Sequence, residues 1–174
     1  MGILNVTPDS FSDGGRYNSV ESAVIQARKL VEDGADILDI GGESTRPGSA
    51  AVSQEEELSR VIPIIKAVSK EVDVPISIDT YKAEVAKQAV EAGAHIINDV
   101  WGGKADRKMA AVAADANVPV ILMHNRNGMA YQSFIRDAFN DLYESISLMK
   151  QAGVKDEHII LDPGIGFAKD LRLN

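Results

Sequence analysis

Short apolar runs rich in β-branched residues alternate along the chain with longer stretches whose apolar residues recur at helical spacing. This alternation is typical of βα units, in which each strand of a parallel sheet is followed by a helix. Successive runs are far enough apart to hold the crossover of about a dozen residues that parallel pairing requires. Six strands are predicted, at residues 2–6, 36–40, 75–79, 95–98, 119–124 and 158–162.

Five helices are predicted to follow the first five strands. The clearest start is Ser53, because Ser53 and Glu56 form a capping box ahead of a stripe of apolar residues. We keep this helix through Pro63 and expect a bend or a broken first segment there, since an interior proline removes a backbone hydrogen bond. The other predicted boundaries are the N-cap residues Asn18, Thr80, Asp106 and Ser133 and the C-terminal glycines Gly34, Gly93 and Gly153.

The sequence indicates one domain covering residues 1–174, because no low-complexity segment, charge block or long linker divides it. The alternating elements place it in the α/β class, and two architectures remain open. A doubly wound sheet can use six strands, whereas a (βα)8 barrel of the TIM type needs eight strands and typically about 250 residues.

The composition excludes several function classes. The 18 Lys and Arg residues against 26 Asp and Glu residues give a net charge of −8, which argues against nucleic acid or an anionic membrane surface as a partner. No stretch approaches the about 18 uncharged apolar residues of a membrane span, and no export signal is visible. The absence of cysteine excludes thiol catalysis and cysteine-ligated metals. We expect a cytoplasmic protein.

Each predicted strand has a polar residue at or next to its carboxyl end. In a parallel sheet or barrel, the loops at this edge build the ligand site, whereas the opposite edge is structural. One such residue could simply cap a helix, but six in six strands favour a shared site. The residues are Asn5, Asp39, Asp79, Asn98, His124 and Asp162.

Three of these residues, Asp79, Asn98 and Asp162, have the chemistry to bind a flat, nitrogen-rich ring. A carboxylate accepts two parallel N–H bonds, and an amide both donates and accepts, so an aminopyrimidine edge fits them. Two structural interpretations stay open. Asp162 could serve only the turn of its Asp-Pro-Gly sequence, and Asn98 could be an internally satisfied loop amide.

Two long loops, residues 5–17 and 41–53, follow the first two strands and are rich in Gly, Pro, Ser and Thr. Connections longer than about six residues are often functional. Arg46 is the only cation of the second loop, and its guanidinium suits phosphate or carboxylate, although a lone arginine is commonly just solvated. No P-loop, dinucleotide fingerprint or nucleophile elbow occurs. Because His95 and His158 begin strands, a three-histidine metal site is excluded.

Five segments, in chain order, give the sequence a family resemblance. They are NVTPDSFSDGG, DIGGESTRPG, SIDT, INDV and LDPGIGF. Together they resemble the signature segments of the dihydropteroate synthases, which are pterin-binding enzymes. The resemblance runs from Gly2 to Lys169, and the two long segments are specific to that family.

The resemblance implies a role for each matching residue. Asp79, Asp162 and Asn98 are implied to bind the pterin edge, with Met123, Val100 and Phe167 as apolar walls. Thr45 and Arg46 match the loop that reaches the diphosphate and the second substrate, and Asn5 matches a ligand associated with Mg²⁺, the implied cofactor. The segment Thr7, Pro8, Asp9, Ser10 and Phe11 is implied to close over p-aminobenzoate.

The implied fold is the TIM-type barrel, and the implied activity is a transferase of folate biosynthesis. It condenses (7,8-dihydropterin-6-yl)methyl diphosphate with p-aminobenzoate to 7,8-dihydropteroate and diphosphate. Asp79 would stabilise the carbocation left when diphosphate departs, while Mg²⁺ and Arg46 stabilise the diphosphate. Closed loops would exclude water, which could otherwise capture the cation. The family is inhibited by sulfonamides and is typically homodimeric.

The sequence lacks two segments of the family pattern, Ser-Arg-Lys after the seventh strand and Arg-x-His after the eighth. The chain therefore holds about six of eight βα units, and we expect a fragment with little activity alone. Two alternatives stay open, namely a non-catalytic pterin-binding remnant and a pterin-dependent methyltransferase domain.

Overall fold

A computed structural model of the chain describes residues 1–6, 15–44 and 51–170, and the side chains of all of these except residues 15–19. Its strands form one parallel sheet in the order β1-β2-β3-β4-β5-β6. All six predicted strands are confirmed, with ends shifted by at most two residues. Their bounds are β1 Gly2–Asn5, β2 Leu38–Gly41, β3 Ile76–Asp79, β4 Ile96–Asp99, β5 Val120–Met123 and β6 Ile159–Asp162.

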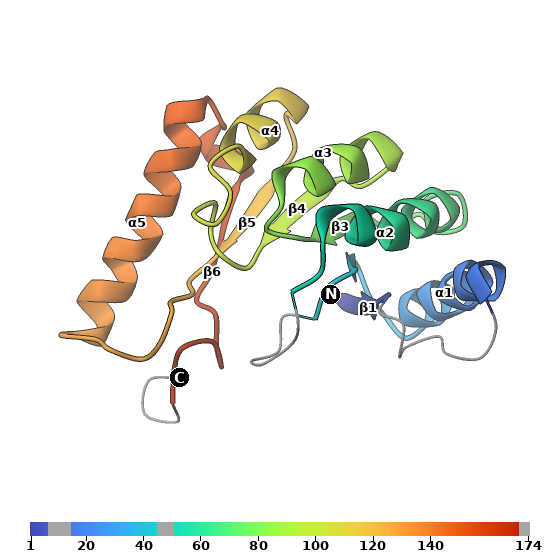
Figure 1. Cartoon of the computed structure of the whole chain (residues 1–174), viewed down its shortest axis with the longest axis horizontal. Helices are drawn as coiled ribbons and strands as arrows, with labels where there is room; N and C mark the ends of the chain where they lie inside the picture. Colours follow the sequence, from blue (N-terminus) through green and yellow to red (C-terminus); the bar gives the residue numbers. More distant parts are fainter. Residues whose placement is uncertain (7–14, 45–50, 171–174) are drawn as a thin grey trace.

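Each of the first five strands is followed by an α-helix, as predicted. The helices are α1 Gly15–Glu32, α2 Gln54–Val68, α3 Ala83–Ala92, α4 Met109–Ala116 and α5 Phe134–Ala152, and a 3-10 turn, η2 Asp156–His158, precedes β6. They form the outer layer over the strands in Figure 1.

The sequential strand order distinguishes the two architectures that the sequence leaves open. A doubly wound sheet reverses its strand order and carries helices on both faces, whereas consecutive right-handed βα units place every helix on one face. Here the order never reverses, and the helices lie on one side of the sheet (Figure 1). The fold is therefore of the (βα)8-barrel type, and the chain supplies six of its strands.

The main core lies between the sheet and the helices. It is built from alternate strand residues that are fully buried, together with apolar residues of the helices. The strand residues are Leu38, Ile40, Ile76, Ile78, Ile97, Val120 and Leu122. Because side chains alternate across a strand, the residues between them face the opposite, inner side of the sheet.

Ser53 is confirmed as the N-cap of α2, whereas the Glu56 carboxylate, the other half of the predicted capping box, pairs with Arg60. The Ser53 Oγ accepts a hydrogen bond from the Glu56 N–H at 3.2 Å. The three predicted C-terminal glycines are confirmed as well, since Gly34, Gly93 and Gly153 have φ values of 99°, 119° and 98°. Left-handed backbone ends a helix at little cost only where no Cβ is present.

Three predicted N-caps are wrong. The helix α1 begins at Gly15 rather than after Asn18, and α3 begins at Ala83, after Lys82. The Thr80 Oγ1 accepts from the Lys82 N–H in a short turn ahead of that helix. Asp106 precedes α4 but reaches across to α3, where its Oδ2 accepts from the Ala83 N–H at 2.9 Å. Its Oδ1 also accepts from the Lys108 N–H at 3.0 Å, so Asp106 shapes the turn ahead of α4 and makes a tertiary contact with α3.

Ser133 holds the N-cap position of α5 as predicted, but its side chain makes no capping bond. Instead the Asp137 carboxylate accepts from the Ser133 N–H at 3.3 Å. The expected break at Pro63 does not occur, because α2 runs continuously through it. Burial of the neighbouring Ile64 and Ile65 against the sheet holds the helix together across the missing hydrogen bond.

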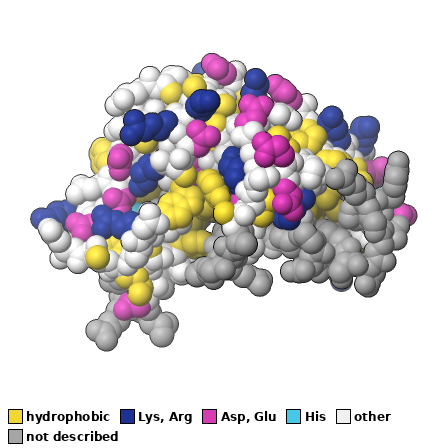
Figure 2. All heavy atoms as spheres, in the orientation of Figure 1, with side chains coloured by type: hydrophobic (Ala, Val, Ile, Leu, Met, Phe, Trp, Pro, Cys, Tyr) yellow, Lys and Arg dark blue, Asp and Glu magenta, His cyan; other side chains and the backbone are white. Residues whose placement is uncertain are grey.

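The two edge strands expose apolar side chains. Ile3 on β1 is 64% exposed, and Ile160 and Leu161 on β6 are 44% and 45% exposed. Among the described residues, each of these strands pairs on one side only. Elsewhere the helical surface in Figure 2 intermingles acidic and basic side chains. No described helix has the length and apolar character needed to cross a bilayer.

The core assignment predicts that Ile65→Ala on α2 destabilises the protein by about 2–5 kcal/mol, because Ile65 is fully buried and its loss leaves a cavity. Ile25→Ala on α1 is the matched control, since Ile25 is 64% exposed and should change stability by less than about 0.5 kcal/mol. Urea denaturation measures both. Equal effects would contradict the described packing.

Candidate functional site

A row of register partners crosses the inner face of the sheet at the carboxyl ends of β1 to β4. Asn5 pairs with Gly41, Gly41 with Asp79, and Asp79 with Asn98. These residues alternate with the buried ones that face the helices, so they lie on the side of the sheet away from the helices. The register therefore aligns an amide, a gap, a carboxyl group and a second amide.

The gap exists because Gly41 carries no side chain. A Cβ at this position would lie 3.3 Å from both the Cβ and the Oδ2 of Asp79. That distance is tighter than ordinary van der Waals contact, so a larger residue would displace the Asp79 carboxyl group. Gly41 thus leaves room between Asn5 and Asp79.

Asp39 lies one layer deeper on the same face and fixes the orientation of Asn98. The Asn98 Nδ2 donates to the Asp39 Oδ2 at 3.1 Å, and Asp39 is 5% exposed. Burial raises the pKa of Asp39, and the hydrogen bond from Asn98 opposes this shift. Because the Asn98 Nδ2 is bound to Asp39, the Asn98 Oδ1 remains available as an acceptor on the inner face of the sheet. It is therefore partly satisfied internally and still able to bind a donor.

Within the row, the pKa of the Asp79 carboxyl group is shifted most strongly. Its Oδ1 is buried without a hydrogen-bond partner among the described residues. Burial first, and then the charges of Asp39, Glu57, Asp99 and Glu43, raise the pKa of Asp79 to about 8. The raised pKa favours the protonated carboxyl group at neutral pH. A guest that brings N–H donors would stabilise the carboxylate and release this proton.

Asp162 lies on the same inner face but not in the same row. Asn98 is level with Ile121 and Ile160, and Asp162 stands two residues further along β6, beside Met123. The offset corresponds to about 10 Å across two strands and about 7 Å along them. Asp162 also accepts the Gly164 N–H at its Oδ1 at 2.7 Å, which confirms the turn role that the sequence left open.

A cavity of about 190 Å³ is lined by residues that follow the carboxyl ends of β2 to β6, and Asp79, Asn98 and Asp162 are not among them. It brings together two of the three expected apolar walls, Val100 and Phe167, whereas Met123 lies outside its lining. The other lining residues are Glu43, Ser44, Tyr81, Trp101 and Asn125. Tyr81, Trp101 and Asn125 also line an adjoining cavity of about 500 Å³. Sequence reasoning missed Tyr81 and Trp101, although each closely follows a polar strand end.

A buried ion cluster holds the rim of the cavity. The Lys82 ammonium binds the carboxylates of Glu43 and Glu57, the latter at 2.5 Å, and Glu57 is 1% exposed. Burial lowers the pKa of Lys82, but the hydrogen bonds to the two carboxylates outweigh it and raise it to about 12. Glu43 also accepts the Tyr81 hydroxyl at 2.8 Å. The cluster therefore ties the start of the second long loop to α2 and to the segment before α3.

Comparison with known proteins identifies the family. The profile described as "Pterin binding enzyme" matches residues 1–174. The chain belongs to this pterin-binding enzyme family.

Relatives of this chain share about half or more of its residues. A dihydropteroate synthase of Clostridium beijerinckii is 60% identical over 174 residues, which make up 100% of this chain and 65% of that protein. A dihydropteroate synthase of Clostridium difficile, crystallised in the presence of pteroic acid, superposes with a TM-score of 0.95 at 50% identity, covering 99% of this chain and 66% of that one.

A third relative is the dihydropteroate synthase of Xanthomonas albilineans solved with 4-aminobenzoic acid. It superposes with a TM-score of 0.93 at 46% identity and covers 99% of this chain and 63% of its own. The chain thus spans between 63% and 66% of the length of these three relatives.

Two polar strand-end residues prove to be structural in this chain. Asp99 faces away from the inner row, is fully buried, and accepts the N–H groups of Trp101 and Gly103 at 2.8 Å each. These bonds shape the turn that presents Trp101, while burial raises the pKa of Asp99 to about 6. His124 is 1% exposed, and its Nε2 lies 3.0 Å from the Asp141 Oδ2 on α5. It therefore does not serve the shared site.

Several predicted site residues lie outside the described part of the chain. They are Thr7, Pro8, Asp9, Ser10 and Phe11 of the first long loop and Thr45 and Arg46 of the second. Asn5, the expected magnesium ligand, is described and ends β1 beside Gly41. Within the described ranges, no three His, Asp or Glu side chains are grouped to hold a metal ion.

The raised pKa of Asp79 has a stability consequence. Because the folded protein holds this proton up to about pH 8 and the unfolded chain releases it near pH 4, the free energy of unfolding falls as pH rises between these values. Asp79→Asn removes the penalty. We expect it to raise the free energy of unfolding by at least about 1 kcal/mol at pH 8 and by little at pH 4.

Urea denaturation at the two pH values measures this effect, with the exposed Asp73→Asn as the matched control. A gain for Asp79→Asn that is the same at both pH values would show that its carboxyl group is not the source of the pH dependence.

Proposed function

We propose that this chain forms the pterin-binding part of a dihydropteroate synthase. The protein condenses (7,8-dihydropterin-6-yl)methyl diphosphate with p-aminobenzoate and releases diphosphate, a transferase reaction of folate biosynthesis. The observation that carries the proposal is the buried, unpartnered Oδ1 of Asp79 beside the oriented Asn98 amide. The named relatives that carry pteroic acid and 4-aminobenzoic acid support the two substrate classes.

The inner row offers acceptors where a pterin has donors. The Asp79 carboxylate accepts N–H bonds of the ring, and the Asn98 oxygen accepts a further one. Asp162 lies on β6, two strands across from Asn98 and two residues further along the strand direction, and approaches the ring from that side. Val100 and Phe167 cover the ring faces, because both line the cavity above the row.

The Asp79 carboxylate also takes part in the reaction. Departure of diphosphate leaves a carbocation that is delocalised into the pterin, and the ionised Asp79 stabilises it without moving. Arg46 binds the departing diphosphate, and Thr45 lies in the same loop segment. Thr7, Pro8 and Phe11 belong to the segment that covers p-aminobenzoate and excludes water, so that the amine rather than water attacks the cation.

Asn5 fits a magnesium ion that takes most of its ligands from water and diphosphate. Its amide oxygen is a hard donor of the type that Mg²⁺ accepts, and it ends β1 across the Gly41 gap from Asp79. When bound, Mg²⁺ would neutralise charge on the leaving diphosphate. Asn5 would hold the ion at the rim of the row.

Further properties of the whole protein belong to the same proposal. We place it in the cytoplasm as a homodimer that sulfonamides inhibit by occupying the p-aminobenzoate position. Because the chain spans about 65% of the length of the Clostridium beijerinckii relative, we expect these 174 residues to bind a pterin with little turnover on their own. Synthase-like turnover by the 174-residue chain would contradict that expectation.

The central test compares Asp79→Asn with Asp39→Asn. Asp79→Asn removes the negative charge that faces the ring, so we expect pterin affinity to fall about 100-fold and kcat to fall further. Asp39→Asn keeps an oxygen that can accept from Asn98, so its effect should be much smaller. Fluorescence titration of the 174-residue chain with a 6-hydroxymethylpterin measures affinity, and steady-state dihydropteroate formation by the whole synthase carrying the same substitutions measures kcat. Equal losses would contradict the role of Asp79.

The pKa of Asp79 also predicts a pH dependence of binding. Because the empty site holds a proton up to about pH 8 and the bound pterin favours the carboxylate, affinity should rise from pH 6 to pH 8 and level off above it. Asp79→Asn, titrated over the same range, corrects for ionisation of the pterin itself. An affinity that does not rise relative to this variant would count against proton release from Asp79.

A further inference from the structure

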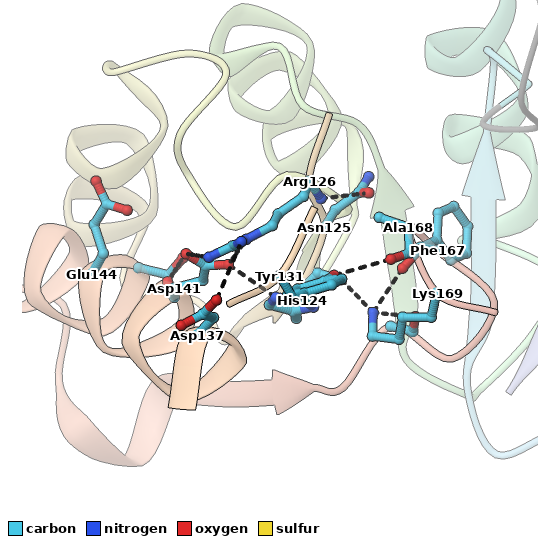
Figure 3. Close-up of polar contacts among 12 residues, drawn as sticks. His124, Asn125, Arg126, Tyr131, Asp137, Asp141, Glu144, Phe167, Ala168 and Lys169 are labelled. Atoms are coloured by element: carbon cyan, nitrogen blue, oxygen red, sulfur yellow. Dashed lines mark hydrogen bonds and ion pairs between the residues drawn. The ribbon is translucent and has the colours of Figure 1, made fainter. Parts of the chain in front are cut away.

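The loop after β6, residues 163–169, ends in a buried lysine. Lys169 is 8% exposed, and its ammonium donates to three backbone carbonyls. The acceptors are the oxygens of His124 at 3.3 Å, Gly164 at 2.7 Å and Phe167 at 2.7 Å. Figure 3 displays these bonds converging on one nitrogen. All three ammonium donors are therefore used.

The arrangement connects two separate elements. The His124 carbonyl follows β5, whereas Gly164 and Phe167 lie in the loop after β6. A charge that is buried against neutral carbonyls is costly to desolvate, and an apolar residue would avoid that cost. Burial accordingly lowers the pKa of Lys169. Because an apolar residue would cost less to bury, stability alone does not explain Lys169. Its hydrogen bonds to the three carbonyls do explain the fixed path of the loop.

Two further contacts hold the loop against the residues that follow β5. A Cβ at Gly164 would lie 2.1 Å from the His124 oxygen, so the backbones approach as closely as glycine allows. The Tyr131 hydroxyl donates to the Ala168 oxygen at 3.0 Å, and Ala168 has a φ of 49°, an unfavourable value for a residue with a side chain. The loop thus keeps a strained path that its contacts determine.

The residues that this path positions belong to the candidate site. The Gly164 N–H binds the Asp162 Oδ1, and the Phe167 side chain lines the cavity above the inner row. A shift of the loop would therefore move a carboxylate and an aromatic wall together.

We infer that Lys169 is a positioning residue for the pterin, and that its ammonium fixes residues 163–169 on the end of β5 so that Asp162 and Phe167 meet the ring. This inference rests on the proposed function for its ligand, but the fixing of the loop is testable without any ligand.

The experiment uses Lys169→Met, which keeps the length and removes the donors, and Lys169→Arg, which restores charge and donors. Lys150→Met is the matched control, because Lys150 is 51% exposed and pairs with Asp156 away from the site. For each variant we would measure the thermal midpoint, hydrogen exchange of residues 163–169 without ligand, and fluorescence titration with 6-hydroxymethylpterin.

We expect Lys169→Met to speed amide exchange in the loop at least tenfold and to weaken pterin binding at least tenfold at a temperature where the variant is folded. Lys169→Arg should recover part of both, and Lys150→Met should change neither. A purely structural role would lower the thermal midpoint but leave the affinity of the folded protein unchanged, and that result would overturn the inference. The inference would also be overturned if Lys169→Met showed the same amide exchange rates and the same pterin affinity as the parent chain.

Two further outcomes are also decisive. If the parent chain binds no pterin but Lys169→Met still loosens the loop, the proposed function fails while the fixing of the loop stands. If Lys169→Met does not fold, Tyr131→Phe replaces it, since this variant removes only the hydrogen bond to Ala168. Tyr131→Phe should then raise exchange and weaken binding at least threefold, and unchanged values for both would overturn the inference.

Discussion

Parallel pairing of very short strands is the constraint on which the site depends. Each strand has only four residues, and each is held in register by its neighbours, so the carboxyl ends of all six meet along one edge. Burial of one face against the helices fixes which side chains turn inward, because a slip by one residue would expose the apolar set. The row from Asn5 to Asn98 is a direct product of this register.

The inner row combines acidic groups that oppose one another. Asp39 and Asp79 lie on neighbouring strands, and Lys82, three residues after Asp79, is already bound by Glu43 and Glu57. Acidic groups placed together in this way lower stability, and a guest rich in N–H donors would relieve their repulsion. The arrangement is an example of stability given up locally for recognition, which is common at functional sites.

Much of the fold was predictable from the sequence, because alternation of apolar runs and helical stretches specifies βα units. The neighbouring placement of Asp79 and Asn98 also followed from their positions at strand ends. The alternation of side chains along β5 could have shown that His124 faces away from the inner row, since it follows the inward-facing Met123. The strand boundaries were uncertain by one residue, however, and one residue reverses the face.

Other features depend on tertiary contacts that no local pattern encodes. Asp106 caps a helix other than its own, and the Lys82 cluster joins three segments distant in sequence. The carbonyl contacts of Lys169 depend on the loop path through Gly164 and Ala168.

The unbroken strand order has a consequence for how the protein assembles. Every strand pairs with the strand before it, so each new βα unit finds its docking edge already present when it leaves the ribosome. Loop closure between neighbours costs less entropy than pairing distant segments. Folding can therefore proceed by addition from the N-terminus, with β6 as the last edge added within these residues.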